Sequence, residues 1–108
     1  MLEDIVLLEV CKAAPSTMEA FKFKFDAGGE FDMVIYDKAS KNCRIYEIKH
    51  STEVNEKQTL HLRDAEKCQI VEKRFGPISG KFVLYRGKDT FAEDVQYLNV
   101  ENFLCSLK

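Results

Sequence analysis

Three charged residues, Asp32, Glu47 and Lys49, have the types and spacing of a metal-assisted hydrolytic site. Glu47 and Lys49 are two residues apart in an apolar segment, so a strand would place them on one face. Asp32 lies in the preceding apolar segment and shares that side of the sheet if the two segments pair as a hairpin. Two carboxylates and a backbone carbonyl suit Mg²⁺ or Mn²⁺, which polarise a phosphate and activate a water. Lys49 would then orient that water or stabilise the developing phosphate charge.

Three predicted strands carry these residues. Residues 21–25 alternate phenylalanine and lysine, the period-two pattern of a half-buried strand. The glycines in residues 27–30 predict a turn, and residues 31–36 resume an apolar strand. A second turn leads to the third predicted strand, residues 43–49. The pattern predicts an antiparallel meander of three strands.

A helix is predicted before the meander, over residues 2–14, and it ends at Pro15. At 100 degrees per residue, Glu9 falls on the same side as the apolar residues of this helix. A carboxylate on a core-facing side is unusual, so Glu9 is a candidate site residue.

A second helix is predicted over residues 52–75, with Thr52 as its N-cap. On a helical wheel Gln58 and His61 lie on the packed side or at its margin, whereas Lys67 lies mostly outside. Gln58 and His61 are therefore candidates for contact with a phosphate, although a histidine there is more often a hydrogen-bonded core residue.

The apolar run 80–87 predicts a buried strand that returns after this helix. A strand, a crossover helix and a second strand favour parallel pairing, so this fourth strand should lie parallel to the third. The tail is open at this level: residues 95–100 are compatible with a fifth strand, and residues 100–107 with a terminal helix that begins at Asn99 or Glu101. The fold class is α/β.

The order of these elements resembles the PD-(D/E)xK nuclease superfamily, whose restriction-endonuclease-like core has a helix, an antiparallel three-strand meander, a crossover helix and a fourth strand parallel to the third. The segments GEFDMVI (29–35), YEIKHS (46–51), QTLHL (58–62) and GKFVLYRG (80–87) resemble more narrowly the C-terminal nuclease-like domain of bacterial and archaeal AAA-type ATPases. Phe31 stands where the superfamily motif has proline.

The resemblance implies a metal-dependent nuclease module that cuts or binds nucleic acid, DNA more readily than RNA. Asp32 and Glu47 would be the ligands of Mg²⁺ or Mn²⁺, Lys49 the catalytic lysine, and Glu9 the acid that some members carry on the first helix. Gln58 and His61 would contact the substrate. The ATPase module that precedes such a domain in the family would be the partner.

Composition limits the class of protein. The 108 residues suffice for one domain, 1–108, with 45% hydrophobic residues and a net charge of -2. The small net charge favours local contact with nucleic acid over a broad basic surface. No apolar run is long enough to span a membrane, and the acidic first residues and four unpatterned cysteines favour a cytoplasmic location with reduced thiols. A homodimer is compatible with the size of the chain.

Two other interpretations stay open at this level. A module of the same fold could be catalytically inactive and bind nucleic acid or support an ATPase partner. A small ligand-binding or interaction domain could carry the same acids and lysine as solvated surface residues. The second interpretation predicts that Asp32 and Glu47 do not converge.

Overall fold

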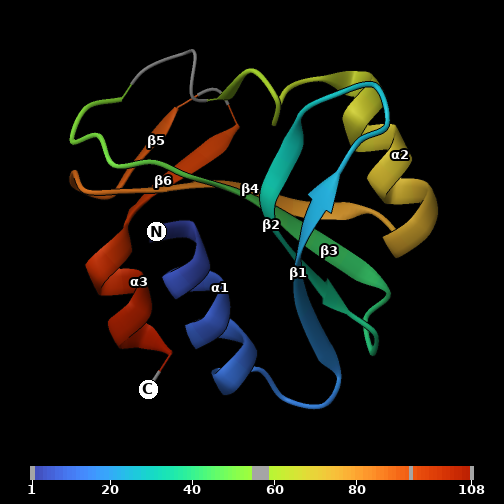
Figure 1. Cartoon of the computed structure of the whole chain (residues 1–108), viewed down its shortest axis with the longest axis horizontal. Coiled ribbons are helices and arrows are strands. Elements are labelled where there is room, and N and C mark those ends of the chain that lie inside the picture. The colour runs from blue at the N-terminus through green and yellow to red at the C-terminus, as the bar shows by residue number, and fades with distance from the viewer. Residues whose placement is uncertain (1, 55–58, 93, 108) are drawn as a thin grey trace.

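The computed structural model describes residues 2–54, 59–92 and 94–107. It is a mixed α/β structure with a six-stranded sheet in the order β1-β2-β3-β4-β6-β5 (Figure 1). The elements, in chain order, are α1 (Leu2–Ala13), β1 (Met18–Lys24), β2 (Glu30–Asp37), β3 (Asn42–Ile48), α2 (Ala65–Phe75), β4 (Ile78–Tyr85), β5 (Thr90–Ala92), β6 (Val95–Asn99) and α3 (Val100–Ser106).

The strand pairing confirms the predicted order. Strands β1, β2 and β3 form an antiparallel meander, and β4 pairs parallel to β3. Strand β6 pairs parallel to β4, and the short β5 pairs antiparallel to β6 at the sheet edge. The sequence did not predict β5, because its three residues include the exposed Phe91 and show no buried alternation.

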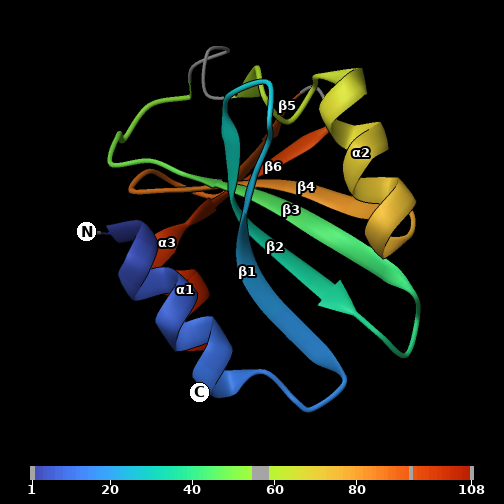
Figure 2. The ribbon, with the colours of Figure 1, turned by 45° about the vertical axis from the view of Figure 1, so that its right-hand side comes forward.

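The sheet separates two hydrophobic clusters. Helix α2 covers one face, whereas α1 and α3 lie together on the other (Figures 1 and 2). On the α2 face the alternating phenylalanines of β1 pack against Phe75, with ring centroids 5.0 Å apart for Phe21 and 5.9 Å for Phe23. On the other face Val6 and Val10 of α1 are buried against the sheet. The two clusters share no residue.

In the described part of the chain, the helix predicted over residues 52–75 is confirmed for Ala65–Phe75 and wrong for residues 52–54 and 59–64. Residues 51–54 form loop and bend, and the helix begins only at Ala65. Asp64 is the N-cap, because its carboxylate accepts hydrogen bonds from the main-chain nitrogens of Glu66 at 3.0 Å and Lys67 at 3.2 Å. Before the cap, the fully buried Leu62 fixes a single turn to the core. Tertiary anchoring and a strong cap therefore override the helical periodicity.

All four cysteines are free, with Cys43 and Cys68 buried and Cys11 and Cys105 exposed. Among the described residues no helix is long and apolar enough to cross a membrane.

Candidate active site

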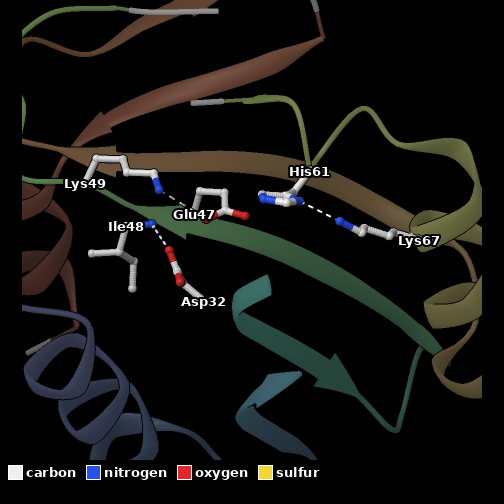
Figure 3. Close-up of polar contacts among 6 residues, drawn as sticks. All are labelled: Asp32, Glu47, Ile48, Lys49, His61 and Lys67. Atoms are coloured by element: carbon white, nitrogen blue, oxygen red, sulfur yellow. Dashed lines mark hydrogen bonds and ion pairs between the residues drawn. The ribbon is translucent and has the colours of Figure 1, made fainter. Parts of the chain in front are cut away.

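Asp32 and Glu47 converge where β2 and β3 part. The last residue pair of the antiparallel register at this end is Met33 with Tyr46. One step further the register would set Asp32 opposite Glu47. At this position the side chain of Asp32, not its main chain, bonds to the end of β3: Oδ2 of Asp32 accepts a hydrogen bond of 2.8 Å from the main-chain nitrogen of Ile48 (Figure 3). This bond fixes one oxygen of Asp32 beside the end of β3.

Glu47 is a buried carboxyl group. It is 2% exposed, and within the described part of the chain its Oε1 has no hydrogen-bond partner. The pKa of Glu47 is raised to about 9, first by burial, then by the neighbouring Asp32 carboxyl and more weakly by the charge of Glu30. Because a buried polar atom without a partner is costly, Glu47 Oε1 is suited to contact a cation or to carry a proton.

Lys49 lies just beyond the end of β3. Its main-chain nitrogen donates to the carbonyl of Leu84 at 2.9 Å, which keeps it aligned with β4. Its Nζ is 3.8 Å from Glu47 Oε2, and the side chain is 41% exposed. The ammonium lowers the pKa of Glu47, but at this distance and exposure it does not offset the effect of burial. Lys49 therefore offers a positive charge at the solvent side of a buried acid.

The donor set suits a divalent cation that keeps part of its water. Across residues 2–54, 59–92 and 94–107, no group of three or more histidine, cysteine or acidic side chains is arranged to hold a metal ion. Two carboxylates alone are nevertheless a usual protein contribution to Mg²⁺, which retains several waters and takes further oxygens from a substrate phosphate. The unpartnered Oε1 of Glu47, beside Asp32 in the described part of the chain, fits such a cation.

Glu9 does not lie where the helical wheel placed it. Its side chain is 47% exposed and contacts Lys12 at 3.8 Å. The buried positions of α1 are Val6 and Val10, so the core-facing side is rotated relative to the prediction, and Ile5 is also 54% exposed. The prediction that Glu9 faces the core is wrong, and within the described residues Glu9 does not join Asp32 and Glu47 in a metal-holding group.

His61 lies in the turn before α2, not on a helix, and it is exposed. The prediction that it packs against the sheet is wrong because α2 begins four residues after it, at Ala65. Gln58 lies outside the described residues. The residue that sequence reasoning missed is Lys67, whose Nζ is 2.6 Å from His61 Nδ1. Asp64 could have indicated it, since a helix capped there turns Lys67 back toward the preceding loop.

No protein-family model matches the chain, and comparison with curated proteins and with solved structures finds no match either.

Proposed function

We propose that this chain is a metal-dependent phosphodiesterase module that acts on nucleic acid, with a restriction-endonuclease-like core. The observation that carries the proposal is the buried Glu47 carboxyl, whose Oε1 has no hydrogen-bond partner among the described residues although Asp32 and Lys49 are its neighbours. A solvated ion pair on a strand would not require burial of the acid. The meander, the parallel fourth strand and the Asp32, Glu47 and Lys49 placement also support the resemblance to the PD-(D/E)xK superfamily.

In this proposal each residue has a distinct role. Glu47 Oε1 and the Asp32 carboxylate would hold Mg²⁺ or Mn²⁺, which supplies Lewis-acid polarisation of the phosphate and an acidic bound water. The hydrogen bond from Ile48 keeps one oxygen of Asp32 oriented, so the other can face the cation. The half-exposed Lys49 ammonium would bind a phosphate oxygen and stabilise the negative charge that develops there.

The partner proposed from the resemblance is an ATPase module, for which this chain would be the C-terminal nuclease-like part. The proposed substrate is DNA, and RNA is tested in the same assay. The competing function is a catalytically inactive module of the same fold, and a cleavage assay distinguishes the active module from the inactive one.

The experiment is a calorimetric titration of Mn²⁺ into wild type, Asp32→Asn, Glu47→Gln and Lys49→Met. The same four proteins are incubated with single-stranded, double-stranded and branched DNA and with RNA. We expect metal binding to be lost in the two acid variants and retained in Lys49→Met. Cleavage should fall about 100-fold or more in Lys49→Met, the usual effect of removing one group that stabilises transition-state charge.

The matched control is Glu19→Gln, which neutralises an exposed acid on the edge strand β1 that pairs with Lys38 at 3.0 Å. It should bind metal and cleave as wild type does. Mn²⁺ binding without cleavage of any substrate would establish the inactive, binding or scaffolding module. No binding in wild type would refute the metal site altogether.

A further inference from the structure

Lys67 and His61 form a cationic pair outside the carboxylate site. Lys67 lies in the first turn of α2, and its Nζ is 2.6 Å from Nδ1 of His61 (Figure 3). A lysine ammonium has only donors, so Nδ1 accepts and the hydrogen of the neutral ring is on Nε2. The pair therefore presents one positive charge and one N–H donor.

A glycine makes room for this pair. A Cβ atom on Gly29 would lie 2.8 Å from Lys67 Nζ and 3.2 Å from His61 Cε1. Gly29 also has a φ of 85°, a conformation that other residues rarely adopt. The pair is thus packed against the turn that leads from β1 into β2.

That turn leads directly to the carboxylates. Asp32 follows Gly29 by three residues, and the charge of the intervening Glu30 acts on the Glu47 carboxyl. In Figure 3 the His61 ring extends from its loop toward Glu47, with its Nδ1 facing Lys67. The cationic pair and the carboxylates therefore belong to the same end of the sheet.

We propose that Lys67 and His61 bind a phosphate of the nucleic-acid substrate, on the α2 side of the metal site and separately from Lys49. This inference rests on the proposed function for its substrate. Lys67 supplies the charge, and His61 Nε2 donates the hydrogen bond. A charge-assisted hydrogen bond of this kind is stronger with a charged phosphate oxygen than with a neutral acceptor.

The neighbouring groove does not offer the same chemistry. A cavity of about 520 Å³ lies between the β1–β2 turn and α2. Its charged lining residues balance, three basic and three acidic: Lys24, Lys67 and Arg74 with Asp26, Asp64 and Glu66. The groove as a whole does not attract a polyanion, and the proposal is confined to Lys67 and His61.

The test uses inorganic phosphate as the probe and the imidazole signals of His61 in ¹⁵N and ¹³C spectra as the readout. The proteins are wild type, Lys67→Met, Lys67→Arg and the control Lys73→Met, which removes an exposed lysine from the same helix. We expect phosphate to shift the His61 signals in wild type, Lys67→Arg and Lys73→Met. Lys67→Met should weaken phosphate binding about tenfold, the loss of one hydrogen bond to a charged group.

Glycine variants test the pair without touching either side chain. Gly29→Ala and Gly28→Ala both place a side chain at positive φ, 85° and 103°, but a Cβ on Gly28 has nothing within 4 Å. We expect only Gly29→Ala to lose the phosphate-induced shift of His61. Amide spectra of each variant confirm that it is folded before phosphate is added.

Two results would overturn the proposal. His61 signals that do not respond to phosphate in wild type show that the pair is not a phosphate site. An equal response in Lys67→Met and Lys73→Met shows that Lys67 has no part in binding. Failure of the proposed function is seen separately, as an absence of Mn²⁺ binding in wild type, and it leaves the response of His61 to phosphate unaffected.

Discussion

Replacement of Glu47 by glutamine should remove a pH dependence from the stability of the folded chain. The pKa of Glu47 is about 9 in the folded protein against 4.5 for an ordinary glutamate, because the side chain is buried next to Asp32. Folding therefore takes up a proton at any pH between these values. Stability from this group is fully present below about pH 4.5 and is lost as the pH rises toward 9.

The magnitude follows from the linkage between protonation and folding. One proton taken up on folding lowers the free energy of unfolding by about 1.4 kcal/mol for each unit of increasing pH. Glu47→Gln has no such proton, so its stability relative to wild type should increase by about 3 kcal/mol between pH 6 and pH 8. Other titrating groups are common to both proteins and cancel in the difference.

The assay is urea unfolding at pH 6, 7 and 8 in the presence of a chelator, so that no divalent cation occupies the site. The control is Glu19→Gln, whose exposed carboxylate should leave the pH dependence of wild type unchanged. A difference between Glu47→Gln and wild type that stays constant within about 0.5 kcal/mol across this range, the usual scatter of surface substitutions, would refute the reasoning. That result would mean that Glu47 is ionised in the folded protein.

Two further outcomes are expected. In the proposed site Mn²⁺ binds the carboxylate form of Glu47, so the affinity of wild type for Mn²⁺ should increase up to about tenfold per pH unit between pH 6 and 8. Binding should release a proton, and calorimetry in buffers of different ionisation enthalpy measures how many protons are released. Gly76→Ala should lower the free energy of unfolding in urea by about 3 kcal/mol or more, because Gly76 has a φ of 86° and a Cβ there would clash with the main-chain oxygen of Lys41. Gly28→Ala, where a Cβ meets nothing within 4 Å, should lose only the conformational part, about 1–2 kcal/mol. Equal losses in the two glycine variants would show that the contact with Lys41 relaxes.

The sheet was the predictable part of the fold. Period-two alternation and glycine turns predicted the meander, and a run of apolar residues after a predicted crossover helix predicted β4 and its parallel pairing. These signals are local, and each strand is long enough to show them. The tail followed for the same reason, with Asn99 as the N-cap of α3.

The long-range parts could not be read from periodicity. The start of α2 depends on the Asp64 cap and on the burial of Leu62 in the core. The helical wheel of the longer predicted helix therefore placed His61 on the packed side of the helix and Lys67 on its exposed side. The phase of α1 depends on which of its apolar residues meets the sheet, and that is decided by packing between α1, α3 and β1. Alternation placed Glu47 on the same face of the strand as Ile45, but its burial, and an Oε1 without a hydrogen-bond partner among the described residues, were visible only in three dimensions.

The division of the interior into two clusters with no shared residue has a consequence for how this chain can evolve. Lys67 lies on α2, and Glu47 alternates along β3 with Cys43 and Ile45 of the cluster under α2, whereas the cluster under α1 and α3 contains neither of them. Drift that reshapes the α2 side for another ligand leaves the opposite cluster intact. The cluster under α1 and α3 can thus keep the fold stable while substitutions on the α2 side change its surface.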